Sequence, residues 1–322
     1  MSVKYVQQDQ IYDLVVRMRT GNRRAVSRLI TMVENENTLR IDIARYIYPY
    51  TGNSYIIGIT GPPGSGKSTL TDKLAKLLRK QGKRVGIVAV DPSSPFSGGA
   101  ILGDRIRMND LALDDEVFIR SMGTRGHLGG LSESVELTVK IFDACNCDYI
   151  LVETVGVGQS EVDIMKMADT TLVVLVPGYG DDIQMIKAGI LEIGDILVVN
   201  KADRDGADQL ASMLNMMQQY GESRENSRVR PVLLTSAYEN KGIEELLNAI
   251  LAHREQRQVS DYYHLNRMNH LRAEIMVMLQ SELSKRLFER YHFDQELDGI
   301  ISEMYERRIN PYDWVESCVN IV

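Results

Sequence analysis

Long apolar runs and cysteines are scarce in this sequence of 322 residues. No apolar run approaches the roughly 18 residues that a membrane-spanning helix needs, and the longest candidate, 171–176, has the length of a strand. Three cysteines, Cys145, Cys147 and Cys318, are too few for a disulfide framework and indicate a reducing compartment. These absences argue against a membrane span and against a disulfide-stapled secreted domain.

An excess of positive charge is also missing, since 37 lysines and arginines face 44 aspartates and glutamates, which leaves a net charge of −7. Nucleic-acid binding needs a basic face, so this balance disfavours a nucleic-acid partner. The first fifty residues hold more basic than acidic side chains, eight against five, which we interpret as a solvated helix face. The N-terminus, MSVKYVQQDQIYDLV, lacks an apolar signal core, so we expect a cytoplasmic protein.

Short apolar runs alternate with amphipathic stretches between residues 55 and 235. With 44% hydrophobic residues the chain can bury a sizeable core, and its length fits two average domains or one large domain with appendages. Apolar strands separated by helical stretches predict an α/β fold, in which a mostly parallel sheet is covered by helices on both faces. The runs predict strands at 55–60, 84–90, 117–121, 149–153, 171–176, 196–200 and 232–235.

Helical periodicity dominates both ends of the chain. Near the N-terminus, apolar residues recur at steps of three and four in two groups, which are Ile11, Leu14, Val15, Met18 and then Val26, Leu29, Ile30, Val33. Beyond about residue 258, a long amphipathic helix is indicated by Leu265, Met268, Leu271, Ile275, Leu279, Leu283 and Leu287. We therefore expect an N-terminal helical extension (1–50), a central α/β domain (51–258) and a C-terminal helical segment (259–322).

The segment GPPGSGKS at 61–68 fits the phosphate-loop pattern G-x-x-x-x-G-K-[ST], and it lies between a predicted strand and a predicted helix, as the motif requires. Its glycines let backbone N–H groups turn around a phosphate, and the helix N-terminus adds partial positive charge. Lys67 is expected to reach the β- and γ-phosphates, and the Ser68 hydroxyl to bind Mg²⁺. The expected nucleotide contacts are Gly61, Pro62, Pro63, Gly64, Ser65, Gly66, Lys67, Ser68 and Thr69.

The tetrapeptide NKAD at 200–203 follows a predicted strand and has the N-K-x-D form of a guanine reader. The Asp203 carboxylate can accept hydrogen bonds from N1 and N2 of guanine, whereas adenine offers an acceptor at N1 and no amino group. A site built on such bonds discriminates strongly, because the wrong base leaves buried polar groups unpaired. We expect Lys201 along the base, Asn200 tying the loop together, and further contacts from Thr235, Ser236, Ala237 and Tyr238.

Three acidic residues are candidates for the surroundings of a metal ion. Asp91 and Glu153 end predicted strands, and Asp104 lies in the glycine-rich stretch SGGAILGDRIRM. Mg²⁺ prefers oxygen ligands, so carboxylates near the phosphate loop suit it, although Asp91 before Pro92 could simply start a turn. We expect the metal site to be formed by Ser68, Asp91, Asp104 and Glu153, and the catalytic groups to be Lys67, Asp91, Asp104 and Glu153.

Three loops combine glycine with polar groups, as nucleotide-sensing loops do, namely 92–110, 155–161 and 177–187. In the second loop, the Gly156 N–H could bind a γ-phosphate. The third loop could report loss of the γ-phosphate to a partner through Asp181, Asp182, Gln184 and Lys187. An equally good interpretation is that Asp181 and Asp182 cap the start of a helix.

Two further features have a structural and a functional interpretation. Arg125 could stabilise transition-state charge, although a structural arginine is favoured, and His127 fits an ordinary loop histidine. Cys145 and Cys147 could suggest a metal, but no second ligand pair accompanies them, so we expect a buried structural role.

Six segments together resemble the MeaB/ArgK family of P-loop GTPases, which includes the methylmalonic aciduria type A protein. They cover roughly residues 60–245 in the family's order and read GITGPPGSGKSTL, VDPSSPFSGGAILGDRIRM, FIRSMGTRGHLGGLS, VETVGVGQSEVDI, VPGYGDDIQMIKAGILEIGD and NKAD. The resemblance implies a GTPase that binds GTP or GDP with Mg²⁺. It also implies a chaperone that protects an adenosylcobalamin-dependent acyl-CoA mutase, usually methylmalonyl-CoA mutase, and gates its cofactor loading.

The resemblance also suggests roles for individual residues. Lys67 and Ser68 would belong to the phosphate and Mg²⁺ site, with Asp91, Asp104 and Glu153 around it, and Asp203 would read guanine. The stretch 181–187 corresponds to the family's third switch. The family forms homodimers through its C-terminal helices, which fits the apolar stripe at 265–287 and makes 259–322 a dimerisation arm.

Three other functions fit the sequence less well. No second catalytic signature accompanies the nucleotide site, so hydrolysis is expected to change shape, slowly in the isolated protein and faster with its partner. A kinase or ATPase serving arginine and ornithine transport is disfavoured by NKAD, and a nickel-delivery GTPase by the five scattered histidines. A nucleotide-locked module without hydrolysis would need a damaged site, whereas Lys67, Ser68 and Glu153 are present.

Overall fold

The computed structural model describes residues 2–35, 37–91, 108–123, 133–154, 164, 166–178, 193–221, 230–259, 261–290 and 293–319. The chain divides into two compact units, Met1–Gln256 and Arg257–Val322.

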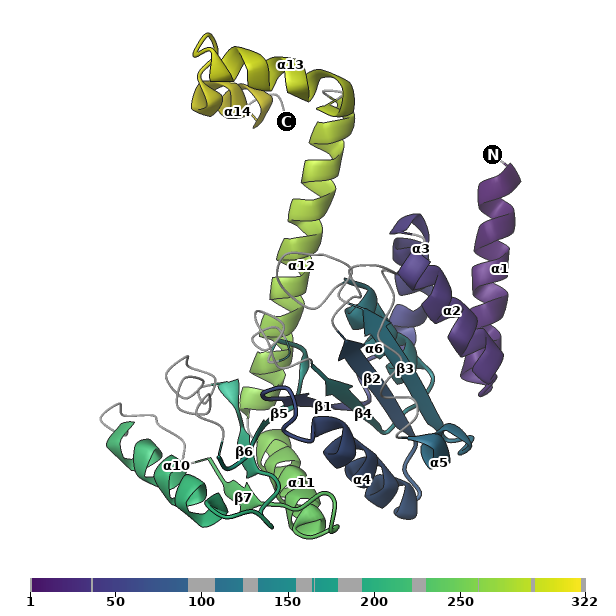
Figure 1. The fold of residues 1–322 in the computed structure, drawn as a ribbon. Coiled ribbons are helices and arrows are strands. Elements are labelled where there is room, and N and C mark those ends of the chain that lie inside the picture. The colour runs from purple at the N-terminus through teal and green to yellow at the C-terminus, as the bar shows by residue number, and fades with distance from the viewer. Residues whose placement is uncertain are drawn as a thin grey trace. The chain divides into compact units, whose positions relative to one another are not determined.

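A parallel sheet of seven strands forms the centre of the first unit (Figure 1). All six pairings between neighbouring strands are parallel, which confirms the predicted α/β fold. The strands are rich in valine, isoleucine and leucine because helices cover both faces of the sheet. In the order in which they lie, they are β3 (Val117–Gly123), β2 (Val85–Asp91), β4 (Tyr149–Glu153), β1 (Tyr55–Thr60), β5 (Thr170–Leu175), β6 (Ile196–Val199) and β7 (Val232–Leu234).

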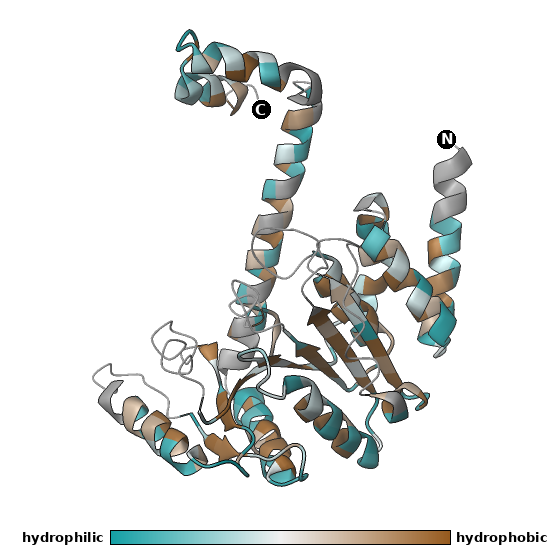
Figure 2. Cartoon of the chain, in the orientation of Figure 1, coloured by the Kyte–Doolittle hydropathy of each residue, from teal (hydrophilic) through white to brown (hydrophobic). Residues whose placement is uncertain are grey.

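Helices pack on the sheet through their apolar faces, which Figure 2 shows in brown against teal outer faces. The helices α4 (Lys67–Lys80) and α11 (Ile243–Val259) share one buried cluster with β1, and α6 (Glu133–Ala144) shares another with β2 and β4. The helix α10 (Ala207–Gly221) packs on β5 and β6. A single turn of helix, α5 (Asn109–Ala112), precedes β3.

Three N-terminal helices belong to the same core as the sheet. These are α1 (Ser2–Arg19), α2 (Arg23–Asn35) and α3 (Asn37–Ile47), followed by the short helix η1 (Tyr48–Tyr50). The Asn22 side chain accepts a hydrogen bond from the Ala25 N–H at 3.0 Å, which caps α2. The apolar residues predicted at helical spacing are all buried, in one cluster with Phe118 and Phe142.

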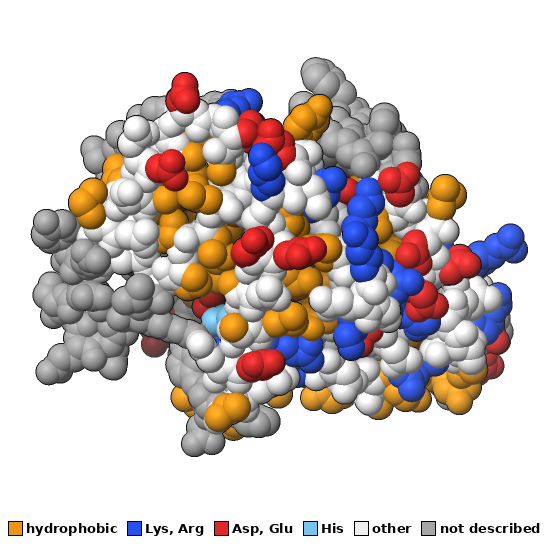
Figure 3. All heavy atoms as spheres, turned by 90° about the horizontal axis from the view of Figure 1, so that it is seen from below, with side chains coloured by type: hydrophobic (Ala, Val, Ile, Leu, Met, Phe, Trp, Pro, Cys, Tyr) orange, Lys and Arg blue, Asp and Glu red, His pale blue; other side chains and the backbone are white. Residues whose placement is uncertain are grey.

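The second unit consists of α12 (Asp261–Arg290), α13 (Phe293–Tyr305) and α14 (Pro311–Val319). The predicted stripe lies on α12, where Leu265 is 53% exposed and Met268 65% exposed. Among the described residues, no helix has both the length and the apolar character that a bilayer crossing requires. Seen from below, the acidic and basic side chains of the described residues are interspersed (Figure 3).

Candidate nucleotide site

The phosphate loop connects the end of β1 with the start of α4 and depends on three glycines. Gly61, Gly64 and Gly66 have φ angles of 136°, 76° and 89°, which other residues rarely adopt. A Cβ atom at Gly61 would lie 2.1 Å from the Val174 carbonyl oxygen, and one at Gly66 would lie 2.4 Å from Asn200 Nδ2. The loop therefore needs glycine at all three positions for its conformation, and at Gly61 and Gly66 for close packing as well.

Lys67 begins α4 and is buried beneath the loop, with 6% of its surface exposed. Its Nζ donates hydrogen bonds to the carbonyl oxygens of Gly61 at 2.8 Å and Pro62 at 2.9 Å. The helix N-terminus adds partial positive charge at the same place. The Ser65 hydroxyl is buried here too, with no hydrogen-bond partner in the described part of the chain. A buried cation, a helix N-terminus and a loop of backbone N–H groups are suited to a phosphate group.

Glu153 ends β4 and faces the first turn of α4, where it is 5% exposed. The Ser68 hydroxyl donates to Glu153 Oε1 at 2.6 Å, and the Thr71 hydroxyl lies 3.2 Å from Oε2. Thr71 was not predicted, although its position one turn after Lys67 places both on one helix face. The structure thus brings a hydroxyl and a carboxylate together beside the phosphate loop.

The oxygens of Ser68 and Glu153 fit a magnesium ion. Mg²⁺ takes one or two carboxylates from the protein and completes its shell with phosphate oxygens and water. No group of three or more His, Cys, Asp or Glu side chains with metal-site spacing occurs among the described residues. This sparse donor set suits an ion that is bound mainly through a nucleotide.

Asn200 ties the NKAD segment to the phosphate loop. Its Nδ2 donates to the Ser65 carbonyl oxygen at 2.8 Å, and its Oδ1 accepts from the Thr235 hydroxyl and the Ala237 N–H, both at 3.2 Å. Lys201 makes a second tie, because its Nζ donates to the Gly64 carbonyl oxygen at 2.7 Å. The NKAD segment and the phosphate loop are therefore one hydrogen-bonded assembly.

Asp203 lies on the exposed side of this assembly. The Ser236 hydroxyl donates to Asp203 Oδ1 at 2.7 Å, and this bond, helped by Arg204 and Lys201, holds the pKa of Asp203 below its usual value. The pKa of Lys201 is lowered by burial and by Arg204. Asp203 is therefore a charged acceptor at neutral pH, as recognition of the two guanine donors requires. Tyr238 follows this turn and is 92% exposed.

The remaining predicted residues are placed only in part. Pro63 is exposed, Thr69 is half-buried on α4, and Asp91 ends β2 with its side chain outside the described residues. Several predictions lie wholly outside the described residues: Asp104, Arg125, His127, Gly156, Asp181, Asp182, Gln184 and Lys187. Cys145 and Cys147 are both buried, as predicted. The described groups gather at the carboxyl ends of β1, β4, β6 and β7, where parallel sheets bind ligands.

Comparisons with known proteins agree with this geometry. The family described as "Methylmalonyl Co-A mutase-associated GTPase MeaB" matches residues 26–292. A Pyrococcus abyssi protein named as a GTPase is 50% identical over 304 residues, which cover 94% of each chain. GTPase ArgK of Escherichia coli is 36% identical over 286 residues, covering 87% of this chain and 86% of that protein.

A solved structure extends the similarity to the whole fold. The crystal structure of an LAO/AO transport system kinase has a TM-score of 0.71 and 26% identity, and the match covers 97% of both chains. The six sequence segments, the parallel sheet and the relatives lead to the same assignment. This chain belongs to the MeaB family of P-loop GTPases, and it is a GTPase.

Proposed function

We propose that this GTPase is a chaperone of an adenosylcobalamin-dependent acyl-CoA mutase, with methylmalonyl-CoA mutase as the first client to test. The nucleotide part of the proposal is carried by one observation, the bonds from Asn200 and Lys201 that join the guanine-reading segment to the phosphate loop. The client part rests on the family description, which names association with methylmalonyl-CoA mutase.

Each described residue of the site has its own role in binding GTP. Lys67 neutralises phosphate charge, and Asp203 accepts the two donors of guanine while Ser236 holds its carboxylate in place. Ser68 and Glu153 would hold Mg²⁺, which would supply positive charge to stabilise the phosphates. We assign the predicted acids Asp91 and Asp104 to the surroundings of the same ion.

Hydrolysis in this proposal changes the shape of the protein and does not transform a metabolite. The stretch 181–187 then acts as the switch that reports the γ-phosphate to the client. We expect slow hydrolysis by the isolated protein and faster hydrolysis in the complex. The three free cysteines are consistent with a reducing compartment, and we propose the cytoplasm.

We further propose that the chain forms a homodimer through its C-terminal arm, 259–322. The stripe on α12 leaves several large apolar side chains about half exposed within one chain, among them Leu265, Ile275 and Leu279. Repeated apolar residues on one helix face are what a second helix covers in a dimer. Gel filtration with light scattering tests this, and a monomer at micromolar concentration would contradict it.

One other function has a specific observation in its favour. The solved relative is titled as a transport system kinase, which raises phosphotransfer to a protein as an alternative. The arrangement of Asp203 and Ser236 favours GTP over ATP. Incubation with radiolabelled ATP and GTP separates the two, because a kinase would leave label on a protein and a GTPase would release it as phosphate.

The decisive experiment measures GTP hydrolysis with and without purified methylmalonyl-CoA mutase and scores complex formation by gel filtration. We expect stimulation together with a stable complex, and neither effect with Lys67→Ala. Hydrolysis with no complex and no stimulation would reject this client while leaving the GTPase intact. The same assay with other adenosylcobalamin-dependent acyl-CoA mutases would then identify the client or reject the chaperone role.

A further inference from the structure

The outer face of α2 carries two arginines that have no partner in the described part of the chain. Arg24 and Arg28 are exposed and lie one helical turn apart, so both point from the same face. Three neighbouring arginines all have acidic partners, and the pairs are Arg23 with Asp115, Arg40 with Glu133, and Arg120 with Glu34. The two positive charges on α2 are thus unneutralised on a chain whose net charge is −7.

These arginines border a shallow, open depression. It is lined by Arg23, Arg24, Ser27, Arg28 and Thr31. The depression runs along the first nine residues of α2, from the N-terminal end, where the Asn22 side chain already accepts the Ala25 N–H, to Thr31. Its open shape and its spread over two helical turns fit the surface of another protein better than a small molecule.

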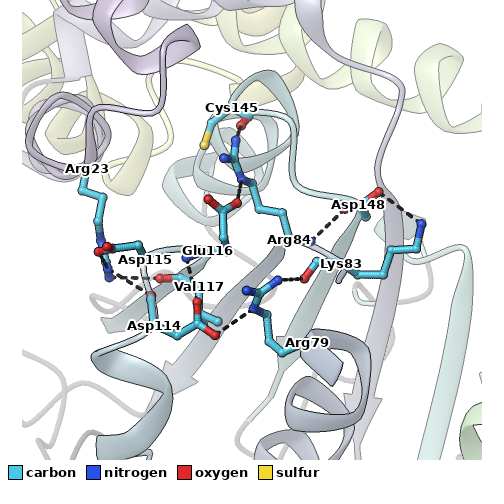
Figure 4. Close-up of polar contacts among 10 residues, drawn as sticks. All are labelled: Arg23, Arg79, Lys83, Arg84, Asp114, Asp115, Glu116, Val117, Cys145 and Asp148. Carbon is cyan, nitrogen blue, oxygen red and sulfur yellow. Dashed lines mark hydrogen bonds and ion pairs between the residues drawn. The ribbon is translucent and has the colours of Figure 1, made fainter. Parts of the chain in front are cut away.

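The helix that carries these arginines is firmly held. The other face of α2 is buried in the core through Ala25, Val26, Leu29, Ile30 and Val33. Arg23 donates to the carbonyl oxygens of Asp114 and Val117, both at 3.0 Å, and so fastens α2 to the turn before β3 (Figure 4).

That turn is itself fixed by two ion pairs from neighbouring elements. Arg79 contacts Asp114 at 2.8 Å, and Arg84 contacts Glu116 at 2.5 Å (Figure 4). Because the backbone of α2 is held in place by these contacts, binding a partner costs little conformational entropy beyond that of ordering the arginine side chains.

We propose that the α2 arginine face, defined as Arg24, Ser27, Arg28 and Thr31, docks an acidic helix of the mutase client that presents two carboxylates one turn apart. Guanidinium groups pair with carboxylates through two parallel hydrogen bonds, and the spacing of Arg24 and Arg28 matches one helical turn. The exposed Ser27 hydroxyl adds a donor between them. Nucleic acid fits less well, because its binding depends on neutralising many phosphates, and this face offers only two arginines that lack an acidic partner among the described residues.

This inference rests on the proposed function, since it locates the contact with the client. Its test uses the full chain with both arginines reversed, R24E/R28E, and the purified methylmalonyl-CoA mutase. The control is R45E on α3, where Arg45 is 73% exposed and lies 3.3 Å from Asp42. For each protein, affinity for the mutase is measured at 50 and 200 mM salt, together with GTP affinity and melting temperature.

We expect R24E/R28E to bind the mutase at least about tenfold more weakly than wild type, with a smaller loss of affinity at high salt. Its GTP affinity and melting temperature should equal those of wild type, and R45E should bind normally. Equal binding by R24E/R28E and wild type, or equal weakening by R45E, would overturn this inference and leave the proposed function intact. If wild type itself does not bind, the proposed client fails and the inference fails with it. A fluorescent RNA bound by wild type and lost by R24E/R28E would assign the face to nucleic acid instead.

Discussion

Asn200 and Ser65 are 135 residues apart in the chain, yet the Asn200 amide donates to the Ser65 carbonyl oxygen at 2.8 Å. This bond joins the NKAD segment, which we propose reads the base, to the phosphate loop. Asn200 is 2% exposed, and its side chain makes three hydrogen bonds within the described part of the chain, so Asn200→Ala leaves buried groups without partners.

We expect Asn200→Ala to lower the free energy of unfolding by about 1–3 kcal/mol and to weaken GTP binding, because the two loops are no longer held together. Urea denaturation and calorimetric titration measure the two effects. The control is Asn53→Ala, which removes one bond from an exposed side chain to Tyr50. A variant with normal GTP affinity would show that the bond is not needed for binding.

Lys67→Ala tests the phosphate site. The Lys67 ammonium makes two hydrogen bonds to the loop, and charge-assisted contacts of this kind are worth about 1.5–3 kcal/mol each. We expect the variant to bind GTP at least about 100-fold more weakly by calorimetric titration. Lys80→Ala, at the exposed end of the same helix, should bind GTP normally. An affinity within twofold of wild type for Lys67→Ala would remove that residue from the phosphate site.

Asp203→Asn tests recognition of the base. An asparagine amide offers a donor where the carboxylate offers only acceptors, so it disfavours the N2 amino group of guanine and favours the carbonyl of xanthine. We expect GTP affinity to fall and xanthosine triphosphate affinity to rise, which changes their ratio by about 100-fold or more. The neighbouring exposed Asp205→Asn is the matched control. An unchanged ratio for Asp203→Asn would mean that another group reads the base.

The ion pairs before β3 predict how stability depends on pH. A hydrogen bond from Arg79 holds the pKa of Asp114 below its usual value, and one from Arg84 does the same for Glu116. A carboxyl whose pKa is lower in the folded state stabilises the fold above its unfolded pKa of about 4, and this contribution is lost as the pH falls through the folded value.

We therefore expect the melting temperature to fall below about pH 4.5 and to fall less in Asp114→Asn, which is also less stable at pH 7 by up to about 1 kcal/mol. The adjacent Asp115 is 91% exposed, and Asp115→Asn should retain the acid sensitivity of wild type. Identical pH profiles for Asp114→Asn and wild type would show that the Arg79 pair does not contribute.

The strands and both nucleotide motifs could be predicted because their signals are local. Buried parallel strands consist of continuous apolar runs, and the prediction at 149–153 coincides with β4. The prediction at 196–200 is one residue longer than β6, because Asn200 leaves the sheet to contact Ser65. The order of the strands was not predicted, since pairing is decided by packing between distant segments.

Contacts between distant segments account for what the sequence did not predict at the site. Nothing in the local pattern shows that Thr71 meets Glu153, 82 residues later. Likewise, the Asp143 carboxylate accepts hydrogen bonds from the N–H groups of Gly52, Asn53 and Ser54, about 90 residues earlier, where the chain enters β1. Helical periodicity predicted that α2 buries one face, but it carries no information about which surface covers that face.

The burial of the N-terminal helices also has a consequence for synthesis of the protein. Arg23 on α2 bonds to Val117, 94 residues later, and Arg19 on α1 bonds to Asn146, 127 residues later. A ribosome adds about 5–20 residues per second, so roughly 5–25 s pass between the synthesis of these two arginines and the synthesis of their partners. Until then only α1 and α3 can cover the apolar face of α2, and the part of it that packs near Phe118 and Phe142 is open to cellular chaperones. The N-terminal helices thus cannot complete their native contacts until synthesis has passed Asn146.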